Sequence, residues 1–85
     1  AYEPIWAIGT NKTPTINEIS DMHFNIKNFL KDKYIYDAKV LYGGSLNTSN
    51  AEEIFSSNFV DGGLIGGASL NADKFLDICK IANIQ

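Results

Sequence analysis

The feature that most constrains the fold is a pair of glycines at the end of each of two predicted strands. Residues 39–42 and 59–65 are short, largely apolar runs typical of buried parallel strands, and they stop at Gly43-Gly44 and Gly66-Gly67. One such pair is equally compatible with a plain tight turn and with backbone N–H groups that approach an anion. Two pairs in succession favour the anion site, because parallel α/β barrels commonly bind phosphate in the loops after their last two strands.

A predicted helix precedes the first of these strands. Thr15 and Glu18 have the spacing of a capping box, which indicates where the helix begins. Apolar residues then recur every three or four positions, so we expect one buried stripe that lies on a sheet, formed by Ile16, Ile19, Met22, Ile26, Phe29 and Leu30. Residues 31–37 are predicted to form a polar connection to the strand.

Two further helices complete a strand-and-helix alternation. A short helix is predicted over 51–57, with Ile54 and Phe55 turned inward, and Ser49 with Glu52 offers it a second capping box. A closing helix is predicted over 71–85, starting at a residue of N-cap type. Its expected apolar face is formed by Phe75, Leu76, Ile78, Cys79 and Ala82.

The first thirteen residues carry the candidate catalytic group, Glu3. Pro4 has no N–H and biases the residue before it toward extended geometry, so Glu3 is predicted to end a strand and to point at a ligand. Residues 5–8 are too apolar for an ordinary solvated loop. They suit a lid that closes over the carboxylate, excludes water and makes Glu3 a stronger base.

Three segments together, AYEPIWAIGT at 1–10, YGGS at 42–45 and GLIGGASL at 63–70, resemble the triosephosphate isomerase family. The resemblance runs along the whole chain. It implies that residues 1–85 form one partial domain of an α/β (β/α)8 TIM barrel, from the end of strand six through the lid loop to helix eight. Since such barrels have about 250 residues, the chain is expected to be a C-terminal portion of a longer one.

The same resemblance implies a role for each matching residue. Glu3 would be the general base that interconverts dihydroxyacetone phosphate and glyceraldehyde 3-phosphate, a step of glycolysis and gluconeogenesis. Gly9, Ser45, Gly66 and Gly67 would donate hydrogen bonds to the substrate phosphate. The lid and its latch would be formed by Pro4, Ile5, Trp6, Ala7, Ile8, Thr10, Asn11, Lys12, Thr13 and Tyr42, with Ser45 as the other residue at which the closed lid is latched. No metal and no organic cofactor are implied.

Some positions depart from the family pattern. Asn11 and Pro14 stand at the far hinge of the lid, and Lys27 stands where an arginine often pairs with an acid, here Asp61. A lysine keeps the charge but cannot form the bidentate contact. The family's catalytic lysine and electrophilic histidine belong to the preceding part of the barrel, and His23 lies on a helix behind the sheet. The 85 residues alone are therefore expected to be inactive.

Composition narrows the partners and leaves two alternatives. Seven lysines against ten acidic residues disfavour nucleic acid, and no apolar run is long enough to span a membrane. Cys79 is the single cysteine, expected in the core, which fits a reducing cytoplasm. The expected partners are a triose phosphate, the remainder of the barrel and, once complete, a second copy in a homodimer. The alternatives are a phosphate-binding partial barrel and a structural fragment without catalysis.

Overall fold

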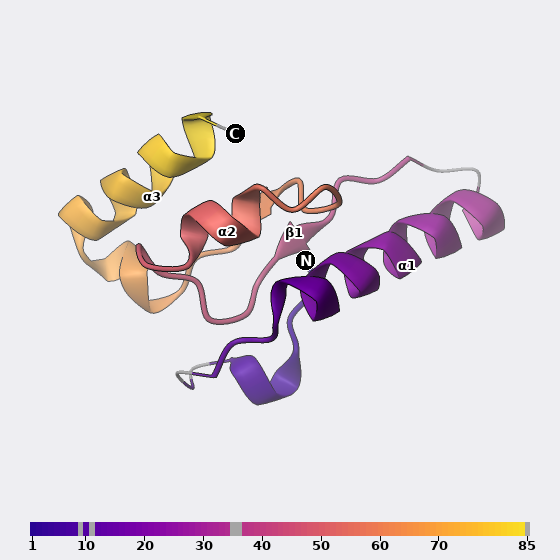
Figure 1. Ribbon diagram of the computed structural model, residues 1–85, viewed down its shortest axis with the longest axis horizontal. Coiled ribbons are helices and arrows are strands. Elements are labelled where there is room, and N and C mark those ends of the chain that lie inside the picture. Colours follow the sequence, from indigo (N-terminus) through magenta and orange to yellow (C-terminus); the bar gives the residue numbers. More distant parts are fainter. Residues whose placement is uncertain (9, 11, 35–36, 85) are drawn as a thin grey trace.

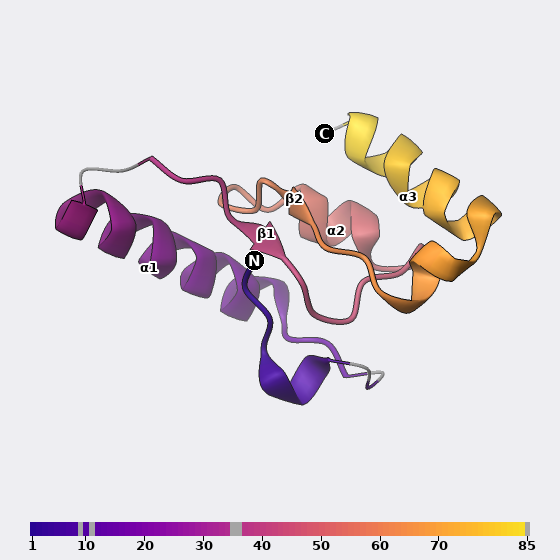
Figure 2. The same ribbon diagram turned by 180° about the vertical axis from the view of Figure 1, so that it is seen from behind.

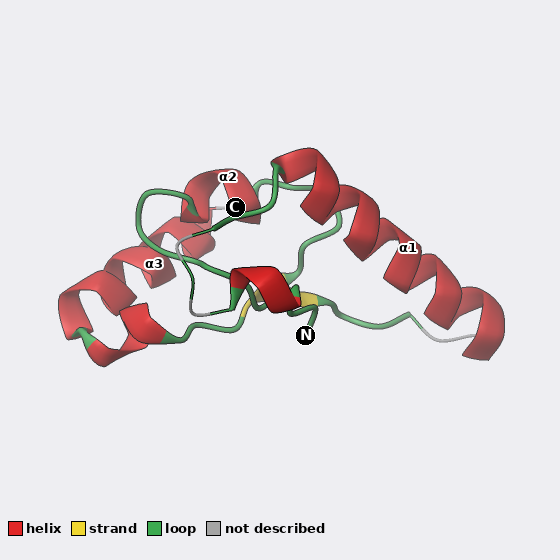
Figure 3. Cartoon of the chain, turned by 90° about the horizontal axis from the view of Figure 1, so that it is seen from below, coloured by secondary structure: helices red, strands yellow, loops and turns green. Residues whose placement is uncertain are grey.

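The computed structural model describes residues 1–8, 10, 12–34 and 37–84 (Figure 1). The chain forms helix α1 (Ile16–Tyr34), strand β1 (Leu41–Tyr42), helix α2 (Ala51–Phe55), strand β2 (Gly62–Gly63) and helix α3 (Ala72–Ile84). Two short 3-10 helices, η1 (Ile5–Ala7) and η2 (Gly67–Leu70), precede α1 and α3. Figure 3 shows α1, α2 and α3 arranged as an arc around the strands. Parallel strands that alternate with helices give an α/β arrangement, as expected for a portion of a (β/α)8 barrel.

Three chain segments run in parallel at the centre of the arc (Figures 1 and 2). β1 pairs with β2 in the register Leu41 to Gly62 and Tyr42 to Gly63, and Tyr2 forms a parallel bridge to Tyr42 on the other side of β1. The N–H of Gly43 donates to the carbonyl of Tyr2 at 2.8 Å, and the N–H of Leu64 donates to that of Tyr42 at 2.9 Å. The carboxyl ends of all three segments therefore meet at one edge.

The regular strands are shorter than the apolar runs that predict them. β1 contains only the last two residues of the predicted run 39–42, and β2 only two residues of 59–65. One further backbone bond, from the Asp61 N–H to the Val40 carbonyl at 3.0 Å, extends the pairing toward the amino ends. An apolar run shows that a segment is buried, whereas strand length depends on which neighbour it meets.

The core lies between the sheet and the helices. Its buried side chains are Ile19 of α1, Ala51 and Ile54 of α2, Ile78 of α3 and, from β1 and the following loop, Tyr42 and Leu46. The inward orientation predicted for Ile54 is confirmed, and Phe55 is half-buried. Apolar burial of this kind contributes about 1.5–3 kcal/mol per large side chain.

The predicted apolar stripes on α1 and α3 are only partly buried. Met22 and Phe29 are 40% and 58% exposed, so their assignment to the buried stripe of α1 is wrong for this chain. Cys79 is exposed as well, which contradicts its expected place in the core. α1 packs with one narrow face, through Ile19 and His23, and α3 packs through Ile78; side chains off these faces meet solvent.

The helix ends test the capping predictions. The Thr15–Glu18 capping box is confirmed: the Thr15 N–H donates to Glu18 Oε1 at 3.0 Å and the Glu18 N–H donates to Thr15 Oγ1 at 3.2 Å. Asn71 Oδ1 likewise caps α3 by accepting from the Lys74 N–H at 3.0 Å. α1 continues to Tyr34, so a polar connection beginning at residue 31 is wrong, because residues 31–34 contain no glycine or proline to stop the helix.

The second capping box, Ser49 with Glu52, is wrong. The Ser49 hydroxyl donates to Asn47 Oδ1 at 2.6 Å, and that oxygen also accepts from the N–H groups of Ser49 and Asn50. Asn50 is the N-cap residue of α2. Its side-chain Nδ2 donates to the Ser45 carbonyl at 3.1 Å, so this asparagine also ties α2 to the loop that follows β1.

An ion pair connects α1 to the start of β2. Lys27 Nζ lies 2.7 Å from Asp61 Oδ2, and the same oxygen accepts the Val40 N–H at 2.8 Å. Burial raises the pKa of Asp61, but the bonds from Lys27 and Val40 outweigh it and leave the pKa below its usual value. Lysine at position 27 therefore forms the pairing in a single-contact geometry.

None of the helices that the structure describes is long and apolar enough to cross a membrane.

Candidate functional site

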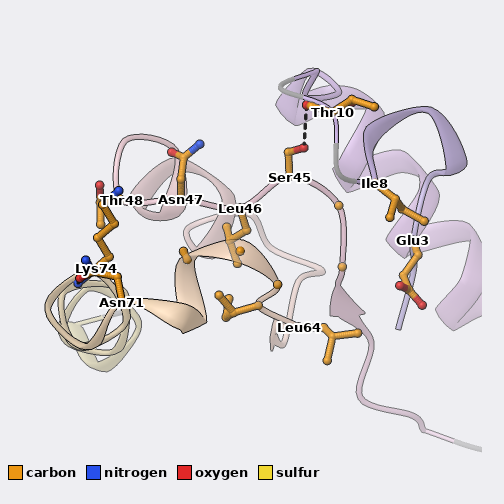
Figure 4. Close-up of a pocket in the computed structure, with 16 residues that line it drawn as sticks. Glu3, Ile8, Thr10, Ser45, Leu46, Asn47, Thr48, Leu64, Asn71 and Lys74 are labelled. Carbon is orange, nitrogen blue, oxygen red and sulfur yellow. Dashed lines mark hydrogen bonds between the residues drawn. The ribbon is translucent and has the colours of Figure 1, made fainter.

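A cavity of about 520 Å³ opens at the carboxyl ends of the three parallel segments (Figure 4). The four predicted catalytic and phosphate-binding residues that the structure describes all line it: Glu3, Ser45, Gly66 and Gly67. They are up to 64 positions apart in the chain, from 3 to 67, and are brought together by the parallel register. Gly9, the fifth predicted residue, lies outside the described residues, as does Asn11 of the lid.

Glu3 follows directly on the bridge between Tyr2 and Tyr42. This places it at a strand end, where the sequence predicts it. Its side chain packs against Gly43, since a Cβ added to that glycine would lie only 2.7 Å from Glu3 Cγ. Glu3 nevertheless remains exposed, so the apolar cover expected over its carboxylate is not assembled in this structure.

The lid is partly folded onto the chain. Pro4 and Ala7 are buried, but Ile5, Trp6 and Ile8 are 88%, 48% and 48% exposed. Ile8 is the one apolar residue among these five that lines the cavity with Glu3 (Figure 4). The lid segment thus packs on the rest of the chain through Pro4 and Ala7, while its large apolar side chains face solvent.

Hydrogen bonds fix the far part of the lid. Thr10 Oγ1 donates to the Trp6 carbonyl at 2.9 Å and accepts the Lys12 N–H at 3.2 Å. Ser45 Oγ donates to the Ala7 carbonyl at 2.6 Å and lies 3.5 Å from the Thr10 carbonyl oxygen (Figure 4). Lys12 and Thr13 are exposed. Ser45 therefore connects the loop after β1 to the lid, across 38 positions of sequence.

Tyr42, the second predicted latch residue, lies beneath the loop rather than against the lid. Its side chain is fully buried, and its ring occupies the space that a side chain at Gly44 would need. Burial, followed by the neighbouring Tyr2, raises the pKa of Tyr42 to about 12. Within the described part of the chain its hydroxyl has no hydrogen-bond partner, so Ser45 alone of the two latch residues bonds to the lid here.

The cavity also contains residues that the sequence patterns did not single out. Lys74 and Asn71 of the α3 start line it together with Thr48, at the end away from Glu3 (Figure 4). Among the lining residues that the structure describes, Lys74 is the one basic side chain and Glu3 the one acidic side chain. The signal available in the sequence was the proximity of Lys74 to Gly66-Gly67, seven positions after the second glycine. The described residues contain no cluster of three His, Cys, Asp or Glu side chains that could hold a metal ion.

Parallel strand ends that meet at one edge, helices around them and a cavity over their carboxyl ends define the class of α/β barrel proteins. The family model described as triosephosphate isomerase matches residues 1–82, and the chain belongs to that family.

Curated relatives and a solved structure agree with this assignment. The triosephosphate isomerase of Porphyromonas gingivalis is 54% identical over 84 residues, which cover 94% of this chain and 34% of the relative. That of Chloroherpeton thalassium is 49% identical over 86 residues, covering 96% and 34%. The crystal structure of the enzyme from Bartonella henselae superposes with a TM-score of 0.84 at 36% identity, over 96% of this chain and 33% of that one. This chain spans about a third of the length of the relatives it matches.

Proposed function

We propose that the chain supplies the catalytic base and two phosphate-binding loops of a triosephosphate isomerase. The reaction interconverts dihydroxyacetone phosphate and glyceraldehyde 3-phosphate by moving a proton between adjacent carbons, with Glu3 as the general base. In this assignment the segment at Tyr2 ends strand six, α1 is helix six, β1 and α2 are strand and helix seven, and β2 and α3 are strand and helix eight. Residues 1–85 then form one partial domain.

One observation carries the proposal: Glu3 lines the same cavity as Ser45, Gly66 and Gly67, the predicted phosphate residues that the structure describes. A carboxylate can accept a proton from a substrate carbon only when the substrate is held beside it. The open backbone at Gly66 and Gly67 suits a phosphate, and binding energy from that non-reacting group can be used to orient the reacting carbons. The proton transfer requires neither a metal nor an organic cofactor.

The lid contributes a second element to the proposed mechanism. Ser45 is proposed to serve the phosphate and already bonds to the lid through the Ala7 carbonyl. Binding of phosphate would therefore change the position of the lid through Ser45. The apolar lid residues Ile5, Trp6 and Ile8 are exposed in this structure. Closure would bring them over Glu3 and exclude water, which strengthens the electrostatic interactions in the site.

The proposal also includes the remainder of the barrel, which this chain does not contain. The chain alone is proposed to be inactive and to gain activity when the first six strands are supplied. The complete enzyme is proposed to be a cytoplasmic homodimer that acts in glycolysis and gluconeogenesis. Retention of a phosphate-binding site without isomerisation is the alternative that the same cavity supports.

The test is a chimera in which this chain replaces the matching third of the Porphyromonas gingivalis enzyme. We expect it to isomerise glyceraldehyde 3-phosphate, and we expect Glu3→Gln to lower kcat by at least about a hundredfold, as for loss of a positioned general base. Glu53→Gln, on the exposed side of α2, is the matched control and should leave kcat unchanged. A folded chimera that binds phosphate but shows no turnover, or a Glu3→Gln variant as active as the control, would reject the catalytic role.

A further inference from the structure

His23 lies outside the cavity, yet it contacts all three segments that carry the site. Its side chain is fully buried in the described core. Its ring meets the ring of Tyr2 edge-on, with centroids 5.7 Å apart, and lies 6.3 Å from the ring of Tyr42. Its Nδ1 is 3.2 Å from the carbonyl oxygen of Phe59. One side chain of α1 therefore spans the backs of three neighbouring segments.

Each contacted residue leads directly into a part of the proposed site. Tyr2 immediately precedes Glu3, and Tyr42 immediately precedes the loop 43–45. Phe59 begins the segment that continues through β2 to Gly66 and Gly67. A shift of the imidazole would thus be transmitted to the base and to both phosphate loops, since the intervening residues are held by the parallel backbone bonds.

The bond to Phe59 determines the protonation state of the ring. A carbonyl oxygen only accepts, so Nδ1 must carry the proton, and in the neutral ring Nε2 is then unprotonated. Nε2 is buried, and in the described part of the chain it has no hydrogen-bond partner. A second proton on Nε2 would therefore place a charge in the core without an acceptor, which is costly.

The surroundings favour the neutral ring. Burial lowers the pKa of His23, and this outweighs the Phe59 bond and the nearby Asp61, which act to raise it. Lys27 lowers it further. Among the described residues, the titratable side chains whose rings pack against the imidazole are Tyr2 and Tyr42.

We propose that His23 is a positioning residue. As the neutral Nδ1–H tautomer, it holds in one arrangement the three strand ends that bear Glu3, Gly43–Ser45 and Gly66–Gly67. This inference rests on the proposed isomerase function. It assigns His23 no contact with substrate. It gives a buried polar residue of α1 a functional reason to be histidine rather than an apolar residue.

Two substitutions separate positioning from mere filling of the core. In the chimera, His23→Asn keeps an N–H donor near the place of Nδ1 but no longer titrates near neutral pH, whereas His23→Leu fills the space and leaves the Phe59 carbonyl without a donor. Because small misplacements of reacting groups can cost up to about a hundredfold, we expect His23→Leu to lower kcat per folded molecule by about tenfold or more. His23→Asn should stay within about threefold of the parent, because the donor is retained. Asn25→Leu, at an exposed position of α1, is the control.

The pH profile gives a readout that a purely structural role would not change. The parent should lose kcat as the pH falls through the pKa of His23, which burial places below the ordinary value of about 6.5, and this component should be absent in His23→Asn. If His23→Leu and His23→Asn have equal kcat values and the same acid limb as the parent, the positioning role is wrong.

Two measurements do not depend on turnover. The nitrogen chemical shifts of His23, identified by the signal missing from His23→Asn, should show the Nδ1–H tautomer at neutral pH. An imidazolium ring or the other tautomer would overturn the inference. Affinity for inorganic phosphate should fall in His23→Leu and be retained in His23→Asn. An inactive parent chimera would reject the isomerase function, while the tautomer and the phosphate affinities would still decide the role of His23.

Discussion

The two glycine pairs are alike in sequence but differ in their surroundings. A Cβ at Gly43 would lie 2.7 Å from Glu3 Cγ, and one at Gly44 would lie 2.6 Å from Tyr42 Cζ. For Gly66 and Gly67, no atom of the described residues lies within 4 Å of the added Cβ. The first pair is filled by the chain's own side chains, whereas the second pair faces open space.

The difference shows that one sequence signal serves two physical purposes. At Gly43 and Gly44 the absence of a side chain lets Glu3 and Tyr42 occupy their positions, so these glycines place the base and the strand end. At Gly66 and Gly67 the absence of a side chain leaves backbone accessible to a ligand, which suits the proposed phosphate site. Substitution of the first pair should therefore act on stability and turnover, and substitution of the second pair on ligand affinity.

The largest effect is expected at Gly44. Gly44→Ala introduces a methyl group where the Tyr42 ring already lies, and we expect the free energy of unfolding to fall by about 2–3 kcal/mol, as for overpacking of a core. Urea unfolding of the complete barrel measures it. Tyr42→Phe removes the hydroxyl, which is one of the two Tyr42 atoms that lie within 3.0 Å of the added Cβ. The double variant should therefore recover part of the lost stability. A Gly44→Ala protein as stable as the parent would mean that the first pair is not filled in solution.

A smaller effect, on turnover rather than on stability, is expected at Gly43. Gly43→Ala should displace the Glu3 side chain, which is exposed and can move, so kcat should fall by about tenfold while the free energy of unfolding falls by about 1 kcal/mol or less. Steady-state kinetics on the chimera give the first value and urea unfolding the second. An unchanged kcat would show that Glu3 does not depend on the space at Gly43.

Acid should weaken the part of the molecule beneath the first pair. His23 has a lowered pKa in the folded chain, so the unfolded chain binds a proton first as the pH falls. The contribution of His23 to the free energy of unfolding is then fully present above about pH 6.5. Below that pH the free energy of unfolding decreases by about 1.4 kcal/mol per pH unit, until the pH reaches the pKa of His23 in the folded chain. Unfolding curves between pH 7.5 and 5 should show this slope, and His23→Asn should reduce it. The same slope in both proteins would exclude His23 as its source.

The smallest effect on stability is expected at Gly67. Gly67→Ala places a methyl group in open space at the start of η2. The free energy of unfolding should therefore change by less than about 1 kcal/mol in either direction, the range of Gly→Ala changes at positions whose backbone alanine can adopt. Affinity for inorganic phosphate should nevertheless fall, because the methyl group occupies the space proposed for the ligand. Calorimetric titration measures it. A stability loss as large as that of Gly44→Ala would erase the distinction between the two pairs.

The sequence predicted the alternation of strands and helices and the edge at which the cavity lies. These features depend on local signals, such as the Thr15–Glu18 capping box and the Asn71 cap, which the structure contains. The placement of Glu3 at a strand end could also be predicted, because Pro4 restricts its backbone. Local signals were misleading where residues compete for one partner, as when Asn47 accepts the Ser49 hydroxyl and prevents the second capping box.

The remaining features depend on contacts between distant residues. Helical periodicity indicates which face of α1 is apolar, but not what covers Met22 or Phe29, and both are exposed in this chain. The role of His23 depends on Tyr2, Tyr42 and Phe59, which lie on three other segments. The difference between the glycine pairs likewise depends on Glu3, forty positions before Gly43. No pattern within one segment contains that information.

The most direct test is the crystal structure of the chimera with inorganic phosphate bound. The account predicts phosphate oxygens within hydrogen-bond distance of the Gly66 and Gly67 N–H groups, with the Glu3 side chain still packed against Gly43. A phosphate seated on the N–H groups of Gly43 and Gly44 with Glu3 and Tyr42 displaced, and none at Gly66 and Gly67, would contradict it.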